Sequence, residues 1–497
     1  MRESRRRMNA FGISVIFFFW AALYLPLLRT SPPWYGDEFF TLNVGLPMTH
    51  GELTNRALYS TFFSYAFNYQ PCFAFLAGLF SRITAGDILG GRFLCALVGL
   101  GTALTGFWFL HRRFGFFCGL FFALFFSSYP QSIIHYRWIY PHGMVGLALV
   151  GAVGLLMRPA RLPQDWKVGV VLILGVASHL LGVYATAAAG FCRFLRPKSW
   201  LPIILPSALF LLFIFFSLNS LLNGWPAEDL SHLLENYEAD SKNSSRGMNL
   251  VHNFVTFFLQ DYFHMSAFLG FFLCLRRRSY MLCIVAFVMS FFLLRNRQNL
   301  TFFYYQALVI LPLLACLAAV GLCGLIRLVS RRFGFGKKFV RAVQSGLCLL
   351  CLLLGLSQVP AVLGGRLPLR ISAWVVDSIP NYEAAAKWLN QKTNPSDLVI
   401  VHWNLGWMLQ CRNADVLMAT AWSGLPAGNF FEPPPARERF CYPVDIQNAK
   451  FFVMTHLDEI WTFQQKSVPT FLQSSGVVSW PIVFQAGTVR ILKNPKL

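Results

Sequence analysis

The residues with the clearest potential for chemistry are two adjacent acids, Asp37 and Glu38, in the stretch WYGDEFF. They follow an N-terminal apolar run, where a membrane-spanning helix would emerge into water. Such a pair can cap a helix, relay protons or ions, or act as a general base on a hydroxyl group. A relay needs carboxylates within the spans, and the apolar runs hold almost no Asp or Glu. A coupled transporter is therefore disfavoured, and capping and general-base chemistry both stay open.

The composition defines the environment of these acids. The chain has 497 residues, of which 56% are hydrophobic and 13% charged, and 51 are phenylalanine. This is typical of a polytopic membrane protein. A formal net charge of +21 would suggest nucleic acid as the partner of a soluble protein. Here the Lys and Arg residues form short clusters between apolar runs, as the positive-inside rule requires, so the predicted partner is the lipid bilayer and not nucleic acid.

The basic clusters orient the chain across the membrane. The segment MRESRRR is expected on the inner side, and no small-residue cleavage site of a signal peptide precedes WYGDEFF. About eleven spans are predicted, at residues 11–28, 92–110, 116–130, 143–157, 168–179, 181–192, 201–222, 263–275, 280–294, 303–326 and 342–358. The N-terminus is then cytoplasmic and the C-terminus lies on the outer face. Arg295 and Arg297 are the exception, because this topology places them outside.

Two regions differ from the spans. Residues 30–91 form a long first outer loop, in which CFAFLAGLF (72–80) is too short to cross the bilayer and is predicted as an interfacial or re-entrant helix. Residues 1–360 are the transmembrane domain, and 365–497 are predicted to be a small α/β domain on the outer face. Its expected helix is 382–393, and its expected strands are 397–403, 415–420, NAKFFVMT and two in PIVFQAGTVRILKN.

Other chemistry is limited by what the sequence contains. Most of the twelve cysteines lie in predicted spans, where they behave as small apolar residues. Cys411 and Cys441 both belong to the outer domain and could pair in an oxidising compartment. The sequence has no HExxH motif and no P-loop, so an ATP-driven pump is unsupported.

The order of several short motifs resembles the GT-C glycosyltransferases that use polyprenyl-phosphate sugars, in particular the protein O-mannosyltransferase and lipid A aminoarabinose transferase branch. The likeness covers most of the chain. It comprises Gly-Asp-Glu on a long first outer loop, the aromatic-proline segment NYQPCFAF, GGRFLCAL at the second span, HRRFG on an inner loop, and RNRQNLTFFYYQALVILPLL. An outer soluble domain also fits this family.

The resemblance implies a reaction and a set of residues. A sugar carried by a polyprenyl phosphate is transferred with inversion to an acceptor on the outer side. Asp37 matches the catalytic base, and Glu38 would orient the site or bind the acceptor or a metal. The phosphate of the donor would be bound by residues that match the family's cations and tyrosines, namely Arg92, Arg295, Arg297, Tyr304 and Tyr305. Snorkelling explains the two outer arginines equally well, and an interfacial aromatic belt explains the tyrosines.

The chain also departs from the family pattern. Arg137 and Pro141 keep their places in the second outer loop, but His142 stands where the family has an aspartate. The acid expected before the proline pair is missing, and Asn68, Tyr69 and Gln70 stand there. Because those acids handle metal or acceptor in relatives, a divalent metal ion is left open as a cofactor. Arg137, His142, His179 and Gln70 are candidates for lining the site, with His135 and His264 weaker ones near the outer face.

Two other functions remain as alternatives. A flippase or transporter of lipid-linked sugars would use the same arginines without needing Asp37, and an O-antigen ligase or polymerase would transfer whole glycans. The Asp37–Glu38 pair favours the monosaccharide transferase. The expected partners are a polyprenyl-phosphate-linked sugar and an acceptor that is a glycan, a lipid or a protein. A bacterial inner membrane is the expected location, because no loop is long enough for the inserted domain of the eukaryotic mannosyltransferases.

Overall fold

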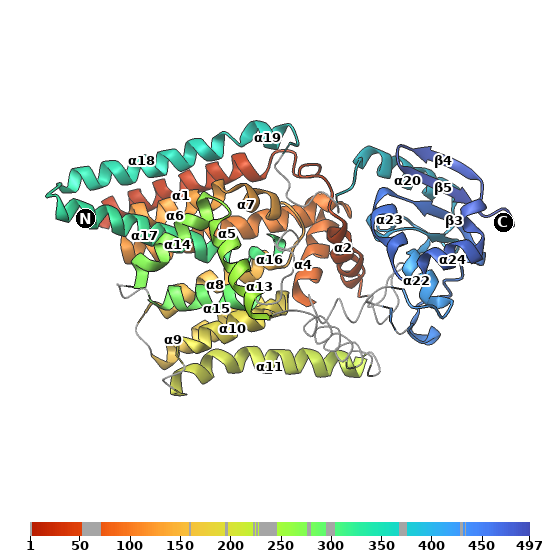
Figure 1. Cartoon of the computed structure of the whole chain (residues 1–497), viewed down its shortest axis with the longest axis horizontal. Coiled ribbons are helices and arrows are strands. Elements are labelled where there is room, and N and C mark those ends of the chain that lie inside the picture. Colours follow the sequence, from red (N-terminus) through yellow and green to blue (C-terminus); the bar gives the residue numbers. More distant parts are fainter. Residues whose placement is uncertain are drawn as a thin grey trace.

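The computed structural model describes residues 2–51, 71–158, 161–193, 197–221, 246–275, 280–294, 304–366, 375–427 and 431–497, together with Gly224 and Ala227 and without residue 433. Long apolar helices form one part of the molecule, and a smaller domain with a β-sheet lies at the other end (Figure 1). The helix that carries the acid pair, α2, lies between these two parts (Figure 1).

The helical part follows the hydrophobic pattern of the sequence closely. Its elements are α1 (Arg2–Tyr24), α2 (Gly36–Met48), α4 (Pro71–Ile83), α5 (Ile88–Phe114), α6 (Phe116–Ser128), α7 (Pro130–His135), α8 (His142–Leu156), α9 (Leu162–Ser178), α10 (Leu181–Phe191), α11 (Pro197–Leu221), α13 (Arg246–Leu259), α14 (Tyr262–Leu275), α15 (Tyr280–Leu294), α16 (Tyr304–Ala307), α17 (Leu311–Arg332), α18 (Lys337–Leu356) and α19 (Val359–Leu363). Ten of the eleven predicted spans each overlap one of these helices, and the span predicted at 303–326 covers α16 and most of α17.

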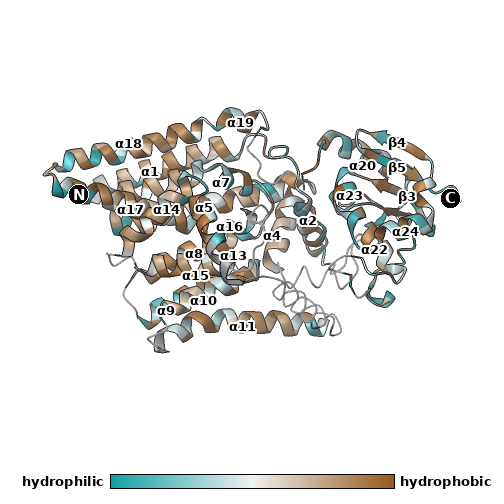
Figure 2. Ribbon diagram, viewed as in Figure 1, coloured by the Kyte–Doolittle hydropathy of each residue, from teal (hydrophilic) through white to brown (hydrophobic). Residues whose placement is uncertain are grey.

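Length separates the helices that can cross a bilayer alone from the others. In the described ranges, five helices are long and apolar enough, and the bent pair α13–α14 would make a sixth. Four more predicted spans correspond to shorter apolar helices, which are α6, α8, α10 and the part of α15 at Leu282–Phe291. The span predicted at 168–179, within α9, belongs to neither group, so the number of eleven spans stays a prediction. Helices α11 and α18, at the edges of the bundle, are largely hydrophobic (Figure 2). They expose large apolar side chains such as Phe213 and Leu353. Such a surface is stable in lipid and not in water, so this is a multi-pass membrane protein.

The segment predicted as an interfacial helix is α4, which packs directly on α2. The two backbones meet at glycines, because a Cβ built on Gly78 would lie 2.1 Å from the carbonyl oxygen of Gly45. A Cβ on Gly45 would likewise lie 2.0 Å from the carbonyl oxygen of Ala74. Only glycine permits this approach. The close crossing fixes the position of α2 relative to α4 and α5.

A larger side chain at this crossing is expected to damage the fold. Gly78→Leu should destabilise the protein by about 3 kcal/mol or more, since the atom that it meets is backbone and cannot turn aside. The fraction of monodisperse protein in detergent and the thermal midpoint measure this. Gly346→Leu is the matched control, because the Cβ of this helical glycine meets nothing within 4 Å. Equal behaviour of the two variants would contradict the packing argument.

The C-terminal domain contains a five-stranded sheet in the order β2-β1-β3-β5-β4. Its elements are α20 (Ile379–Lys392), β1 (Leu398–Ile400), α21 (Trp403–Gly406), β2 (Arg412–Ala414), α22 (Val416–Trp422), the 3-10 turns Arg437–Arg439 and Ile446–Asn448, β3 (Ala449–Met454), α23 (His456–Ile460), Thr462–Gln464, α24 (Val468–Ser475), Val477–Ser479, β4 (Ile482–Ala486) and β5 (Val489–Lys493). Strand β1 is parallel to β2 and β3, and β5 is antiparallel to β3 and β4.

Most elements predicted for this domain are confirmed, and one is wrong. The helix, β1, β3 and the β4–β5 hairpin lie where the sequence predicts them, and the hairpin turns at Gly487 with φ +58°. Residues 415–420 were expected to be a strand, but they form α22, and the Asp415 carboxylate caps it by accepting a hydrogen bond from the backbone N–H of Met418 at 2.8 Å. An apolar run of this length has no periodicity that separates strand from helix. Cys411 is buried and Cys441 is exposed, and no disulfide joins these two cysteines in the described domain.

Candidate functional site

Helix α2 begins at Gly36, so both acids lie in its first turn, where negative charge is favoured by the helix dipole. Their surroundings differ sharply. Glu38 is fully buried, and one oxygen of its carboxylate accepts hydrogen bonds from the backbone N–H of Tyr35 at 2.9 Å. The other oxygen accepts one from the backbone N–H of Ile139 at 3.0 Å. Glu38 thereby ties the start of α2 to the loop that follows α7.

The main partner of Glu38 is Arg92, which is also fully buried. The guanidinium donates from Nε to one carboxylate oxygen at 2.9 Å and from an Nη to the other at 2.6 Å, a bidentate pair. Its remaining N–H groups point at the carbonyls of Leu28 (3.1 Å), Pro32 (2.8 Å) and Pro33 (3.3 Å). Protein atoms thus engage every N–H of Arg92. This geometry does not support the phosphate-binding role predicted for it.

Arg137 occupies an equivalent position nearby. It is fully buried, and its Nε donates to the carbonyl of Ser31 at 3.0 Å while an Nη donates to that of Leu23 at 2.9 Å. The other Nη donates to the carbonyls of Pro26 and Ser31. Arg92 and Arg137 together hold the segment that connects α1 to α2. The sequence predicted Arg137 as a residue that lines the site, whereas its guanidinium in the structure binds backbone.

The environment of Asp37 differs from that of the fully buried and paired Glu38. Asp37 is half-buried, and no group in the described ranges donates a hydrogen bond to its carboxylate. Burial, and secondly the charge of the adjacent Glu38, raise the pKa of Asp37 to about 6. A carboxylate with no internal donor and a pKa close to neutrality can accept a proton from a substrate hydroxyl. Of the two acids in the first turn, Asp37 is the one that its surroundings leave available for chemistry.

Aromatic rings and histidines form a cluster with Tyr35, the residue that precedes α2. The ring of Tyr35 lies 4.9 Å from Trp138 and 5.6 Å from Tyr140, measured between centroids. Tyr140 lies 6.0 Å from His142, and His142 lies 4.3 Å from His179. The structure therefore brings His142 and His179, predicted separately as site residues, into contact with each other and with this ring cluster. Small-molecule sites commonly combine such rings with a few polar groups.

His135 belongs to the same cluster and was a weaker candidate in the sequence. Its ring lies 5.3 Å from Trp138 and is almost fully buried. Burial lowers its pKa to about 3, so the imidazole is neutral at physiological pH. Within the described ranges, neither ring nitrogen has a hydrogen-bond partner. A neutral imidazole in this position can donate to or accept from a sugar hydroxyl, but it cannot act as a cation for a phosphate.

Several predicted residues cannot be placed with the cluster. Arg295, Arg297 and Gln70 lie outside the described residues. Tyr304 and Tyr305 begin α16, and the positions of their side chains are not described. His264 pairs instead with Asp261 at 2.9 Å. No group of three or more His, Cys, Asp or Glu side chains that could hold a metal is found among the described residues, so a metal site remains a prediction.

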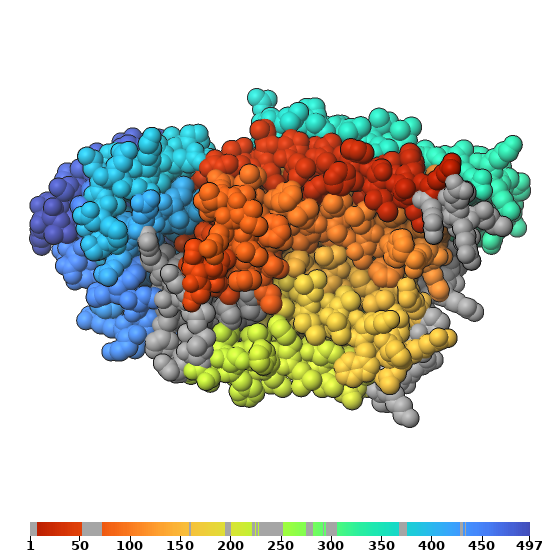
Figure 3. Space-filling model, turned by 180° about the vertical axis from the view of Figure 1, so that it is seen from behind, coloured from red at the N-terminus to blue at the C-terminus, as the bar shows by residue number. Residues whose placement is uncertain are grey.

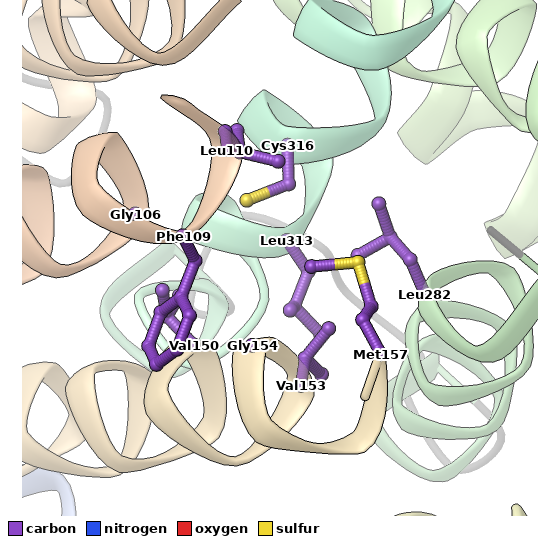
Figure 4. A pocket seen from close by; sticks show the side chains of 10 residues that line it. All are labelled: Gly106, Phe109, Leu110, Val150, Val153, Gly154, Met157, Leu282, Leu313 and Cys316. Atoms are coloured by element: carbon purple, nitrogen blue, oxygen red, sulfur yellow. The ribbon is translucent and has the colours of Figure 1, made fainter. Parts of the chain in front are cut away.

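A pocket between α5, α8, α15 and α17 is a separate feature (Figure 4). It is lined by Gly106, Phe109, Leu110, Val150, Val153, Gly154, Met157, Leu282, Leu313 and Cys316. These side chains are apolar and offer no acid, base or strong hydrogen-bond donor. The pocket lies near the C-terminal ends of α5 and α8, whereas Arg92 and His142 lie near the N-terminal ends of these helices. It is therefore separate from the candidate site.

One contribution to the site comes from the C-terminal domain and has no signature in the sequence. The domain packs against the segment that contains α2 and α4 (Figure 3). The backbone N–H of Val376 donates to the carbonyl of Trp34 at 2.7 Å, and the Trp403 indole N–H donates to the carbonyl of Gly36 at 3.1 Å. Contacts between residues more than 340 positions apart carry no local signal, so no motif could have revealed them.

Comparison with solved structures identifies the architecture. ArnT from Cupriavidus metallidurans bound to undecaprenyl phosphate superposes with a TM-score of 0.66 at 13% identity, over 98% of this chain and 97% of ArnT. The archaeal oligosaccharyltransferase AglB from Archaeoglobus fulgidus, in complex with an inhibitory peptide and a dolichol-phosphate, superposes with a TM-score of 0.52 at 12% identity, over 90% of this chain and 69% of AglB. No family model and no curated protein sequence matches the chain. At such identities the likeness establishes the fold alone.

Proposed function

We propose that this chain, whose fold is that of the GT-C glycosyltransferases, is an inverting glycosyltransferase with Asp37 as its general base. It would move a sugar from a polyprenyl-phosphate donor to an acceptor on the outer face of the membrane. One observation carries the proposal: Glu38 and Arg92 are fully engaged with each other and with backbone, while the adjacent Asp37 carboxylate has no donor among the described residues and a raised pKa.

The proposed reaction is a single displacement. The acceptor oxygen forms a bond to the anomeric carbon while the bond from that carbon to the phosphate oxygen breaks. Asp37 takes the proton from the acceptor hydroxyl, and the polyprenyl phosphate leaves with the bonding electron pair. Asp37 then releases the proton to solvent. Because attack and departure occur on opposite faces of the sugar, the product has the inverted anomeric configuration.

The negative charge that develops on the leaving phosphate requires cations nearby. Arg92 and Arg137 are occupied by protein acceptors, which leaves Arg295 and Arg297 as the proposed phosphate ligands. They precede α16, whose first residues are Tyr304 and Tyr305, the tyrosines proposed to contact the same phosphate. Tyr35, Tyr140, His135, His142 and His179 would then face the sugar or the acceptor. The outer-face location and the bacterial inner membrane are part of the same proposal.

The pH dependence of turnover should follow the ionisation of the Asp37 carboxyl group. A base works only when ionised, and burial raises the pKa of Asp37 from 3.8 to about 6. We therefore expect kcat/KM to fall tenfold per pH unit below about pH 6, where a carboxylate in water would stay ionised down to about pH 4. Initial rates of transfer between pH 4.5 and 8 measure this limb. A rate that stays constant down to pH 4.5 would contradict the assignment.

Release of polyprenyl phosphate tests the function itself. Purified protein in lipid nanodiscs is incubated with undecaprenyl-phosphate-linked hexoses and pentoses and with candidate acceptors, either glycan, lipid or peptide. The proposal expects acceptor-dependent release of undecaprenyl phosphate and a product with inverted configuration. A protein that moves the intact donor across proteoliposomes without cleaving it is a flippase. Transfer of a whole glycan from a diphosphate donor would indicate a ligase or polymerase.

A further inference from the structure

The part of α2 that carries Asp37 is in contact with the C-terminal domain as well as with the membrane helices. We infer that Trp403 of the C-terminal domain is a positioning residue for Asp37, so that this domain completes the catalytic site. The inference rests on the proposed function, since it assigns a role in the reaction attributed to Asp37. It extends that function, because it makes turnover depend on a residue more than 360 positions away.

The contact of Trp403 is with the peptide bond that leads to Asp37. The indole N–H donates a hydrogen bond of 3.1 Å to the carbonyl oxygen of Gly36. That carbonyl belongs to the peptide plane that joins Gly36 to Asp37, so its orientation sets the direction in which the Asp37 Cα–Cβ bond leaves the backbone. Both Trp403 and Gly36 are buried, and a hydrogen bond shielded from water holds its geometry more firmly than an exposed one.

Trp403 is itself rigidly supported. It begins α21, which follows the interior strand β1 after two residues. The His402 side chain caps that helix by accepting a hydrogen bond from the N–H of Asn404 at 3.3 Å. On the other side, the carbonyl of Trp403 accepts a hydrogen bond from the Asn43 side chain at 3.3 Å. The same Asn43 amide donates to the carbonyl of Phe39 at 2.9 Å. Trp403 is thus bonded to α2 twice, because its indole N–H donates to Gly36 and its carbonyl accepts from Asn43.

Aromatic packing closes this contact to water. Trp407, one turn after Trp403, stacks on Phe39 with 5.4 Å between ring centroids and an angle of 19°. Its ring also meets the edge of Trp34 at 5.9 Å, and Trp34 meets Phe39 at 5.5 Å. Trp34 and Phe39 are fully buried and lie on either side of Gly36 and Asp37. The rings of Trp34, Phe39 and Trp407 therefore form a cluster next to the hydrogen bond to Gly36.

The two neighbours of Asp37 are consequently held by different parts of the molecule. Trp403 holds the carbonyl of Gly36 from the C-terminal domain, and Arg92 holds the carboxylate of Glu38 from the membrane part. The side chain of Asp37 between them accepts no hydrogen bond from any residue in the described part of the chain. A base must meet the substrate hydroxyl within a few tenths of an ångström, and misplacement by about 1 Å can cost about 100-fold in rate. This arrangement supplies that precision.

The test is Trp403→Phe, which keeps an aromatic ring in the cluster and removes the N–H donor. We expect kcat to fall about tenfold while KM for the lipid-linked donor is unchanged, because substrate binding is intact and only the base is misplaced. Trp388→Phe is the matched control. Trp388 lies in the same domain and packs on Phe451 and Phe484, both at 5.4 Å, away from α2. Its kcat should equal that of the wild type.

A double-mutant cycle separates positioning from a general loss of structure. If Trp403 acts through Asp37, then Trp403→Phe should cause little further loss of the residual turnover in an Asp37→Asn background. Additive losses would overturn the inference, as would a wild-type kcat for Trp403→Phe. A tenfold loss in the Trp388→Phe control would also overturn it. Failure of the proposed function has a different signature, because the wild type would then transfer no sugar or Asp37→Asn would retain full activity.

Discussion

Asp37→Asn is expected to lower the rate of sugar transfer by about 10²–10⁴-fold, the range that a positioned general base contributes. Asparagine keeps the size of the side chain but cannot accept a proton at neutral pH. The measurement is kcat for acceptor-dependent release of polyprenyl phosphate by purified protein. KM for the donor should change little, because the proposed phosphate ligands, Arg295 and Arg297, are elsewhere in the chain.

The same substitution should not destabilise the protein. Ionised Asp37 is partly buried without a donor, so the folded protein carries this charge at a cost above pH 6, where the pKa of about 6 leaves it ionised. Removing it should leave the thermal midpoint at pH 8 unchanged or higher. Asp445→Asn is the matched control, since Asp445 caps a short turn in the C-terminal domain and asparagine caps equally well. Full activity of Asp37→Asn would exclude Asp37 as the base and favour a ligase or a transporter.

Arg92→Ala is expected to destabilise the protein by about 3–5 kcal/mol, the usual effect of leaving a buried charge without its partner. The Glu38 carboxylate would keep only its two backbone donors, and the carbonyls of the connecting segment would lose theirs. Arg92→Lys should be nearly as damaging, because an ammonium group cannot reproduce the bidentate geometry. Thermal unfolding in detergent, followed for each variant, measures the loss.

A charge-free pair distinguishes this structural role from phosphate binding. Glu38→Gln combined with Arg92→Met buries no unpaired charge and should recover part of the stability that Arg92→Ala loses. Arg113→Ala, at an exposed arginine of the same helix, is the control and should unfold as the wild type does. If Arg92→Ala instead unfolded normally and lost only affinity for the polyprenyl-phosphate donor, the phosphate-binding role predicted from the sequence would be correct.

The sequence determined the elements of this protein because their signals are local. The apolar runs predicted helices at positions where the structure has them. The order of short motifs indicated the GT-C architecture. The base candidate also came from the sequence, since Asp37 and Glu38 are adjacent and lie at the start of a helix. The mistaken strand at 415–420 shows the limit, as a short apolar run is compatible with strand or helix.

Only the tertiary structure decided which polar residues are available for chemistry. By residue type alone, Asp37 and Glu38 are both carboxylates and Arg92 and Arg137 are both cations, and only the resemblance to a family assigned them different roles. The fold pairs Glu38 with Arg92, directs Arg137 to backbone carbonyls, and leaves Asp37 without a donor among the described residues. It also brings Trp403 to the peptide bond before Asp37. Such pairings join residues 54 to 367 positions apart, and packing selects them after the local elements have formed.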